Sequence, residues 1–205
     1  MRGVFITFEG VEASGKSTLA KILYEWLLSN EVPAVFTRDP GGTEVGEHLR
    51  KLLLKEEMAL DDITEALLYA AARRQLVVEV IYPSLVAGKV VVCDRFSDSF
   101  FAYQGFGRGL SLDLLKVLND AATQGLMPNL TFLIDISPEV AFTRLKTRDR
   151  LESEDMEFHR RVYEGFMNLY NSSKERIVLL DGNKKLSDLF EEVKDKIAPF
   201  INLPA

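Results

Sequence analysis

The sequence predicts an α/β fold in which a parallel sheet is covered by helices. Two observations indicate this class: short apolar segments alternate with longer amphipathic ones, and a glycine-rich loop joins the first apolar segment to the first amphipathic one. Strand and helix in repeated alternation are typical of a parallel sheet with helical crossovers. There is no internal repeat, low-complexity tract or Gly/Ser linker, so we expect one domain over residues 1–205.

Five segments are brief, nearly free of charge and rich in Val, Ile, Leu and Phe, which predicts β-strands. They are Val4–Phe8, Ala34–Thr37, Lys89–Cys93, Leu130–Ile134 and Arg176–Leu180. Unbroken apolar stretches such as Val90–Cys93 favour burial on both faces of a sheet. Amphipathic periodicity predicts helices near residues 17–29, 43–54, 62–86, 111–122, 138–147, 155–174 and 186–198.

The composition limits the classes of function. Asp and Glu number 31 against 25 Lys and Arg, a net charge of −6, so wholesale binding of nucleic acid is not expected. Cys93 is the single cysteine, and His48 and His159 are the two histidines, which excludes an internal disulfide and argues against a zinc centre. The sequence shows neither a secretory signal nor a long uncharged apolar stretch, and we therefore expect a cytoplasmic protein without a membrane partner.

Residues 10–17 read G-V-E-A-S-G-K-S and match the phosphate-binding pattern G-x-x-x-x-G-K-[ST]. A strand precedes this loop and a helix follows it, as phosphate binding by backbone N–H groups and a helix N-terminus requires. Lys16 is expected to reach the β- and γ-phosphates of a nucleotide, and Ser17 to offer its hydroxyl to Mg²⁺. The alternative is a glycine turn with a solvated Lys16. The residues expected to contact the donor nucleotide are Gly10, Val11, Glu12, Ala13, Ser14, Gly15, Lys16, Ser17 and Thr18.

Asp94 ends an apolar strand, at the edge where a parallel sheet presents its ligands. Because a P-loop enzyme needs an acid near its metal, Asp94 is expected to join Ser17 in holding Mg²⁺. The alternative is that Asp94 caps a helix that begins near Ser97.

The remaining motifs separate a nucleotide-controlled switch from a metabolite kinase. A guanine-nucleotide switch should carry N-K-x-D, but the nearest match, at residues 183–186, reads N-K-K-L. A metabolite kinase needs a second anion site for its acceptor, and the planar fork of arginine matches phosphate oxygens. Arg38, Arg73 and Arg95 lie at suitable places, although Arg73 stands in an apolar stretch and can also be read as extending outward to solvent.

Five further segments occur in order around the P-loop. They are T-R-D-P-G-G-T at 37–43, Y-A-A-A-R-R-Q at 69–75, C-D-R-F at 93–96, A-Y-Q-G at 102–105 and D-R-L-E at 149–152. Together they resemble the bacterial thymidylate kinase family from the first strand to the last helix. The resemblance implies transfer of the γ-phosphoryl group of ATP to dTMP, giving dTDP and ADP, with Mg²⁺. It also implies a homodimer and a P-loop nucleoside-monophosphate-kinase fold, with a five-stranded parallel sheet flanked by helices and a short lid.

The resemblance assigns the acceptor site residue by residue. Arg38, Arg73 and Arg95 match the arginines around the dTMP phosphate, and Glu12 matches an acidic loop residue at the sugar and phosphate end. A carboxylate among phosphates would be costly without such a use, although a solvated turn is the alternative for Glu12. Pro40 matches a proline that the family resemblance suggests is cis; the alternative there is a simple turn.

Aromatic residues are expected to recognise the nucleoside. Tyr69 matches a residue that stacks on thymine, and Tyr103 matches the tyrosine that crowds the sugar 2′ position; ordinary core packing is the alternative for both. Phe100 departs from the family, which usually has Ser, Thr or Asn there to contact the base edge. A phenyl ring cannot hydrogen-bond thymine, so strictness for thymine stays open, with Ser99, water or packing as substitutes.

Residues 148–154, R-D-R-L-E-S-E, are expected to form the lid. Ala13 and Ser14 stand where some family members have a basic residue, so the P-loop offers no catalytic arginine. The sequence resembles the bacterial arrangement in which the lid supplies that arginine, with Arg150 the first candidate and Arg148 the second. A solvated charged loop is the alternative. The expected catalytic residues are Lys16, Arg95, Arg148 and Arg150.

Two rival functions remain at this point. Another small-metabolite kinase, acting on a different deoxynucleotide or a nucleoside, would share the P-loop and the Asp94-Arg95 pair. A P-loop switch or binding module belongs to a different class, and the missing guanine motif and the three arginines count against it.

Overall fold

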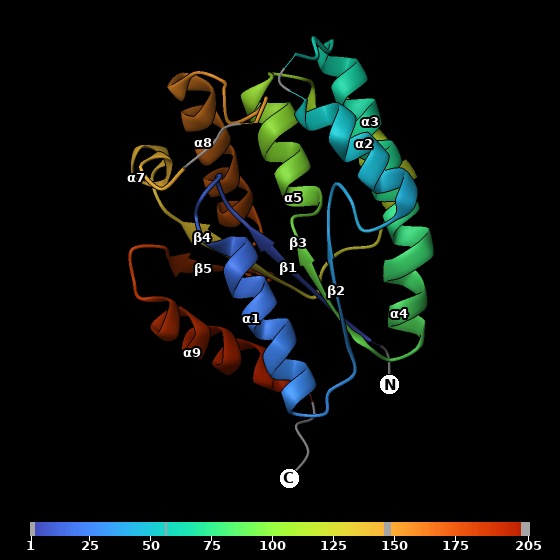
Figure 1. Cartoon of the computed structure of the whole chain (residues 1–205), viewed down its shortest axis with the longest axis vertical. Helices are drawn as coiled ribbons and strands as arrows, with labels where there is room; N and C mark the ends of the chain where they lie inside the picture. The colour runs from blue at the N-terminus through green and yellow to red at the C-terminus, as the bar shows by residue number, and fades with distance from the viewer. Residues whose placement is uncertain (1–2, 56, 146–148, 202–205) are drawn as a thin grey trace.

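Five parallel strands form one sheet in the computed structural model, which describes residues 3–55, 57–145 and 149–201. The strands are β1 (Val4–Glu9), β2 (Ala34–Arg38), β3 (Val90–Asp94), β4 (Leu130–Asp135) and β5 (Ile177–Asp181). Their order across the sheet is β2-β3-β1-β4-β5, with β1 at the centre (Figure 1). Each pairing between neighbours is parallel, so the predicted α/β fold with its five-stranded parallel sheet is confirmed.

Helices cover both faces of the sheet (Figure 1). Their bounds are α1 (Lys16–Ser29), α2 (Glu44–Leu54), α3 (Asp62–Leu76), α4 (Tyr82–Val86), α5 (Ser97–Phe100), α6 (Leu112–Thr123), α7 (Pro138–Phe142), α8 (Met156–Ser172) and α9 (Leu186–Ile197). The π-helical segments η1 (Val77–Ile81) and η2 (Phe101–Gly107) and the 3₁₀ turn η3 (Ala198–Phe200) are also present. Thr43, Asp61 and Asp155 cap α2, α3 and α8 by accepting hydrogen bonds from first-turn N–H groups. In the part of the chain that the structure describes, no helix is long and apolar enough to cross a membrane.

The strands are buried on both faces because successive side chains alternate between them. On one face Ile6, Phe8 and Phe132 are fully buried in a cluster with apolar residues of α1 and α9. On the other face Phe5 and Val91 belong to a separate cluster beneath the helices that follow β2. This double burial explains why the strands read as nearly unbroken apolar segments.

Residues 62–86, expected as one helix, are helical throughout but change their winding. α3 passes into π-helical η1 and then into α4, whose second residue is Pro83. Pro83 has no N–H to donate to the carbonyl of Glu79, and in an α-helix its ring would clash with that carbonyl. The wider π turn before Pro83 relieves both problems.

The helices differ from the predictions in two places. The helix expected near 138–147 ends at Phe142, and the Thr143 hydroxyl donates to the carbonyl of Val140 at 2.7 Å, a local bond that competes with helix continuation. The periodicity also predicts no helix over residues 97–107, which are helical in α5 and η2; a helix beginning near Ser97 entered only with the alternative for Asp94. Gly107 lies against α8 so closely that a Cβ would stand 2.7 Å from the ring of Phe158. Packing against α8, rather than helix propensity, accounts for this segment.

The carboxyl ends of β1, β2 and β3 bring charged residues to one edge of the sheet. Glu9 ends β1, Arg38 ends β2 and Asp94 ends β3, and the register of the sheet pairs Arg38 with Asp94. The P-loop leaves this edge directly after Glu9. Residues that are far apart in the sequence are therefore neighbours here.

Phe132→Ala should destabilise the fold strongly, because Phe132 is fully buried and its ring stacks on Phe8 with centroids 5.1 Å apart. We expect the free energy of unfolding to fall by about 3–5 kcal/mol. Leu28→Ala is the control, since Leu28 is 47% exposed on α1, and it should change stability by less than about 0.5 kcal/mol. Urea denaturation followed by circular dichroism measures both, and equal losses in the two variants would contradict this description of the core.

Candidate active site

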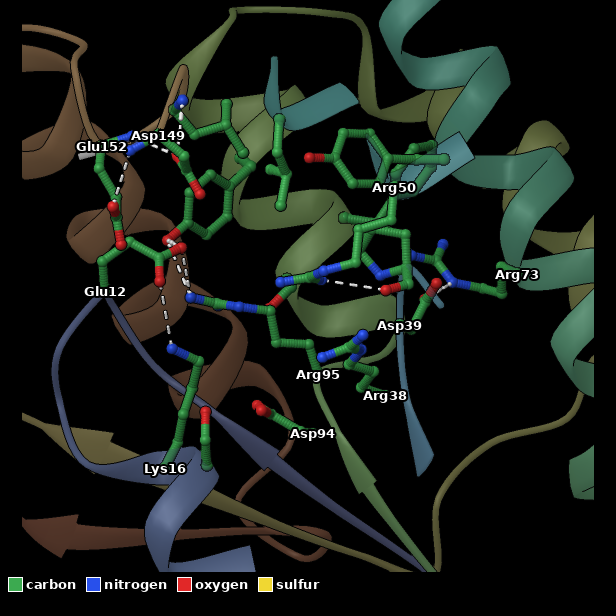
Figure 2. Close-up of a pocket in the computed structure, with 18 of the residues that line it drawn as sticks. Glu12, Lys16, Arg38, Asp39, Arg50, Arg73, Asp94, Arg95, Asp149 and Glu152 are labelled. Atoms are coloured by element: carbon green, nitrogen blue, oxygen red, sulfur yellow. Dashed lines mark hydrogen bonds and ion pairs between the residues drawn. The ribbon is translucent and has the colours of Figure 1, made fainter. Parts of the chain in front are cut away.

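A pocket opens at the carboxyl edge of β1, β2 and β3, between the P-loop, α3, the 97–107 helical segment and a lid segment that we define as residues 149–154 (Figure 2). Five basic and five acidic side chains line it, together with aromatic ones. The lining residues are Glu12, Lys16, Ser17, Arg38, Asp39, Pro40, Arg50, Leu54, Tyr69, Arg73, Asp94, Arg95, Ser99, Phe100, Tyr103, Gln104, Asp149, Leu151 and Glu152. Thus the structure brings together every residue expected at the acceptor site and both expected metal ligands.

The P-loop backbone adopts conformations that only a few residue types tolerate. Gly10 and Gly15 have φ angles of 139° and 95°, and Ala13 lies in the left-handed region at 53°. A Cβ on Gly10 would stand 2.9 Å from the carbonyl oxygen of Ile134, so glycine is required there. Among the described residues, no side chain caps the first turn of α1, whose N–H groups can therefore serve an anion.

Lys16 begins α1 and extends toward Glu12 and Arg95 (Figure 2). It is 5% exposed, so the solvated alternative is wrong. Its Nζ makes long contacts, 3.3 Å to the carbonyl oxygen of Val11 and 3.4 Å to Oε2 of Glu12. Burial and the positive charge of Arg95 lower the pKa of Lys16, while the charge of Glu12 raises it. An ammonium held by such long contacts can exchange them for phosphate oxygens.

Arg95 is the centre of the polar network. Its Nη2 donates to Oε1 of Glu12 at 2.6 Å, and its Nη1 donates to the carbonyl of Gly10 at 2.8 Å and to Oγ of Ser99 at 2.9 Å. The Tyr103 hydroxyl donates to the same oxygen of Glu12 at 3.0 Å. Burial raises the pKa of Glu12, but the charges of Arg95 and Lys16 outweigh it and hold that pKa well below the usual range. Glu12 is thus an ionised, paired group, and the solvated-turn alternative is wrong.

Glu9 belongs to this network, although the sequence patterns do not single it out. It is fully buried, its Oε1 accepts a hydrogen bond from the N–H of Phe96 at 2.8 Å, and its Oε2 accepts one from the Ser99 hydroxyl. Burial and the charge of Asp98 raise the pKa of Glu9 to about 7. Because Ser99 also binds Arg95, Glu9 helps to set the position of that arginine. A carboxylate at the end of an otherwise apolar strand was the signal available in the sequence.

Arg73 is 2% exposed, so the alternative of an outward-pointing side chain is wrong. Its Nε donates to Oδ2 of Asp39 at 2.5 Å, its Nη1 to Oδ1 of Asn119 at 3.2 Å and its Nη2 to the carbonyl of Phe96 at 3.4 Å. The guanidinium lies 4.7 Å from the ring centroid of Phe100. Arg73 therefore ties α3 to the loop after β2 and to α6 while it forms part of the pocket wall.

The loop after β2 and helix α2 contribute two more cations. The Asp39–Pro40 peptide bond is cis, as the resemblance implied. Arg38 pairs with Oε2 of Glu47 at 2.8 Å and keeps 46% of its side chain exposed. Arg50 donates to the carbonyl of Pro40 at 3.0 Å. The sequence does not distinguish Arg50 from an ordinary surface arginine of an amphipathic helix.

Tyr69, Phe100 and Tyr103 form an aromatic wall. Each lines the pocket and also packs in the apolar cluster between α3, the 97–107 segment and α8, so a ligand role and a core role are compatible. Burial raises the pKa of both tyrosines, which keeps their hydroxyls neutral. Ser99, a proposed substitute for the missing base contact at Phe100, is already engaged by Glu9 and Arg95.

Asp94 and Ser17 fit a magnesium site. Oδ1 of Asp94 is buried and has no hydrogen-bond partner among the described residues, and Ser17 lines the same pocket. The alternative that Asp94 caps a helix is wrong, because Phe96 occupies the cap position of α5. Within the described residues, no three His, Cys, Asp or Glu side chains gather closely enough to hold a metal by themselves. Two oxygen ligands suit Mg²⁺, which takes its other ligands from water and nucleotide phosphates.

The lid segment presents acidic side chains to the pocket. Asp149 and Glu152 line it, whereas Arg150 turns away, with its Nη2 donating to Oε2 of Glu65 at 2.5 Å and its side chain 11% exposed. Asp149 and Glu152 belong to the D-R-L-E segment, but the sequence patterns assign no role to them or to Glu65. Arg148, the second candidate for a catalytic lid arginine, lies outside the described residues.

A second hollow lies on the other side of the P-loop. Ser14, Gly15 and Thr18 contribute to its lining, together with the cationic side chains of Arg144 and Lys184. The P-loop therefore separates two cavities, and Lys16 faces the first of them.

Comparison with known proteins agrees with this geometry. Residues 8–193 match the model of the family described as "Thymidylate kinase". The thymidylate kinase of Caldanaerobacter subterraneus subsp. tengcongensis is 44% identical over 203 residues, covering 98% of each chain, and that of Carboxydothermus hydrogenoformans is 48% identical over 197 residues, covering 95% of this chain and 96% of the relative. Among solved structures, the thymidylate kinase from Ehrlichia chaffeensis superposes with a TM-score of 0.80 at 35% identity, covering 97% of this chain and 100% of the other. A P-loop beside an arginine-lined pocket, with near full-length similarity of sequence and structure, leads to one conclusion: the chain belongs to the thymidylate kinase family.

Proposed function

We propose that this chain transfers the γ-phosphoryl group of ATP to dTMP, giving dTDP and ADP. Family membership supports the reaction. The observation that carries it at the level of residues is the pocket in which Lys16 of the P-loop faces Arg95 across Glu12, so that a donor and an acceptor phosphate can meet (Figure 2). A cytoplasmic location is part of the proposal, because the cytoplasm supplies the ATP.

Catalysis in this proposal is positioning and charge neutralisation. The acceptor oxygen of dTMP is already anionic, so the protein needs no base to activate it. Lys16 and the P-loop N–H groups neutralise the donor phosphates, and Arg95 and Arg38 hold the acceptor phosphate in line. Mg²⁺, when bound by Ser17 and Asp94, supplies further positive charge to the phosphate oxygens. Glu12 accepts a hydrogen bond from each of the two cations Lys16 and Arg95, which orients them and offsets their mutual repulsion.

The two cavities support a separate place for each substrate. The aromatic wall of Tyr69, Phe100 and Tyr103 offers faces for a base and a deoxyribose, which supports dTMP in the first pocket. The hollow beyond the P-loop, with Arg144 and Lys184, suits the remainder of ATP. Arg73 completes the acceptor wall by its contact with Phe100.

Purified protein should form ADP from ATP fastest with dTMP in a coupled assay across dTMP, dUMP, dGMP and thymidine. Lys16→Met should remove nearly all turnover, by about 10²-fold or more, because this ammonium alone among the P-loop side chains can neutralise the transferring phosphates. Circular dichroism should show an unchanged fold. Turnover like that of the wild type in a folded Lys16→Met protein would sink the P-loop mechanism, and a higher rate with another acceptor would favour the rival metabolite kinase.

Arg95→Ala should raise the KM for dTMP about tenfold or more and change the KM for ATP less than about twofold, since a lost charged hydrogen bond is worth roughly 1.5–3 kcal/mol. Arg160→Ala is the matched control, because Arg160 pairs with Glu139 at 2.8 Å on the surface and its side chain is 53% exposed. Steady-state kinetics with each substrate varied in turn measures both. A larger rise in the KM for ATP than in the KM for dTMP would show that Arg95 binds the donor and not the acceptor, and would contradict the proposal.

A homodimer of single-domain subunits is the proposed assembly. Large apolar side chains lie exposed along one stripe of the 62–86 helical segment. When the exposed Ala71 is counted with them, neighbouring members of the stripe are four or seven residues apart. Such spacing places them on one face of a helix. They are Ile63, Leu67, Val78, Tyr82 and Val86, and Leu114 and Val117 are exposed on the neighbouring α6. A stripe of this kind supports an interface with a second copy.

Leu67→Glu should convert the dimer to a monomer, because a carboxylate would be buried without a partner at the interface. Leu67 is 49% exposed in the single chain, so the fold should survive. Val140→Glu, at a position 43% exposed on α7, should leave the assembly unchanged. Sedimentation equilibrium gives the mass of each variant, and a wild-type protein that is monomeric at micromolar concentration would contradict the proposal.

A further inference from the structure

A buried cluster of charges joins the lid segment to α3, and the mechanism above does not use it. Glu65, in the first turn of α3, is fully buried. Its Oε1 accepts a hydrogen bond from Nε2 of Gln104 at 2.7 Å, and its Oε2 accepts one from Nη2 of Arg150 at 2.5 Å and one from Nη2 of Arg108 at 3.3 Å. A buried carboxylate is costly unless cations and donors surround it, so this position depends on the two arginines.

Arg150 is held on its other side by the end of α2. Its Nε donates to the carbonyl of Leu53 at 2.7 Å, and its backbone N–H donates to the carbonyl of Leu54 at 3.4 Å. These carbonyls belong to the last turn of α2, where the helix dipole favours a cation. The guanidinium therefore faces protein groups, and Arg150 is outside the set of residues that line the pocket.

Arg108 anchors the other end of the lid segment to the same carboxylate. Its Nη1 lies 2.6 Å from Oε1 of Glu154, and its Nη2 lies 3.3 Å from Oε2 of Glu65. The guanidinium also packs 4.8 Å from the ring centroid of Phe158. Positions 150 and 154 of the lid segment are thus both tied to Glu65.

The residues between these two anchors face the pocket. Asp149, Leu151 and Glu152 line it, and Leu151 is 6% exposed in the apolar cluster that contains Tyr69. The turn itself is ordered, because Oδ1 of Asp149 accepts from the N–H groups of Leu151 and Glu152, both at 2.9 Å, and Oε2 of Glu152 accepts from the N–H of Asp149. If the contacts of Arg150 and Arg108 with Glu65 break, nothing in the described cluster of charges holds the turn against the pocket.

We propose that Arg150 is a positioning residue, which with Glu65 latches the lid segment over the acceptor pocket. Glu65 lies one helical turn before Tyr69, and Gln104, its hydrogen-bond donor, follows Tyr103 in sequence. The same carboxylate therefore couples the lid segment to both tyrosines of the aromatic wall. This role replaces the expectation that Arg150 meets the transferring phosphoryl group. The kinetic part of the inference rests on the proposed function, whereas the latch itself does not.

The kinetic test compares Arg150→Ala, Arg150→Lys, Glu65→Gln and the double variant Glu65→Gln/Arg150→Ala, with Arg160→Ala as the control outside the latch. Arg150→Ala and Glu65→Gln should each raise the KM for dTMP about tenfold, because a change of that size corresponds to the free energy of one charged hydrogen bond. The KM for ATP should stay within about twofold of the wild-type value. The double variant should resemble the worse single variant, because both remove the same interaction. Arg150→Lys, which keeps the charge, should recover part of the loss.

A different kinetic result would overturn the inference. An arginine that stabilises the transferring group contributes on the order of 10³-fold or more to kcat. If Arg150→Ala loses kcat on that scale with an unchanged KM for dTMP, while Glu65→Gln keeps the wild-type kcat, then Arg150 is catalytic. Wild-type kinetics in every variant would equally overturn the role of the latch in binding dTMP.

Limited proteolysis tests the latch without any turnover. A glutamate-specific protease, acting on the protein without nucleotides, should cleave after Glu152 and Glu154 at least about fivefold faster in Glu65→Gln and Arg150→Ala than in the wild type, because local opening sets the cleavage rate. Mass spectrometry maps the cuts, and Arg160→Ala should be cleaved at the wild-type rate. Unchanged cleavage in both latch variants overturns the inference.

The outcomes also separate the latch from the proposed function. If the wild-type protein fails to phosphorylate dTMP but the variants give the expected cleavage pattern, the proposed function is wrong and the latch is supported. Should Glu65→Gln fail to fold, the two Arg150 variants, which change a loop residue, decide the outcome.

Discussion

The ion pair between Arg95 and Glu12 joins the two loops on which the pocket is built. Glu12 belongs to the P-loop after β1, and Arg95 follows β3, so their contact at 2.6 Å holds the carboxyl ends of two neighbouring strands in one arrangement. The pair also settles protonation, because the arginine and Lys16 keep the pKa of Glu12 low in a buried place where burial alone would raise it. With Glu12 ionised, Lys16 and Arg95 can lie near one another before any phosphate arrives.

Two other arginines of the site also pair with carboxylates, but the two pairs are buried to different degrees. Arg73 and Asp39 form an almost fully buried pair, with side chains 2% and 1% exposed, whereas Arg38 and Glu47 are 46% and 37% exposed. Breaking a buried pair leaves an uncompensated charge, but an exposed pair is worth little because water replaces it. The buried pair therefore acts as framework. The exposed one leaves Arg38 able to change partners, which is compatible with its proposed role at the acceptor phosphate.

The acceptor wall and the lid depend on one another through packing. Leu151 of the lid segment lies in the same apolar cluster as Tyr69 and Tyr103, and the buried carboxylate of Glu65 accepts a hydrogen bond from Gln104, the residue after Tyr103. Phe100 extends the aromatic surface at a position where the family usually has a polar side chain, and the guanidinium of Arg73 lies 4.7 Å from the centroid of its ring.

Local pattern alone was enough for the sheet, the P-loop and the charged strand ends, because strand and helix periodicity and the loop motif involve residues close together in sequence. Lys16, Asp94 and Arg95 could be found in this way, and the resemblance added Glu12 and the aromatic wall. The hydrogen-bond partners of Glu9, the role of Glu65 and the orientation of Arg150 could not be found, since the groups that meet are distant in sequence: Glu9 meets Ser99 across 90 residues, and Arg150 meets Glu65 across 85. Whether an arginine faces a pocket or a buried carboxylate depends on which groups surround it in space, and burial makes that pairing obligatory. The spacing of residues in the sequence does not specify that environment, so only the tertiary structure determined the orientation of Arg150.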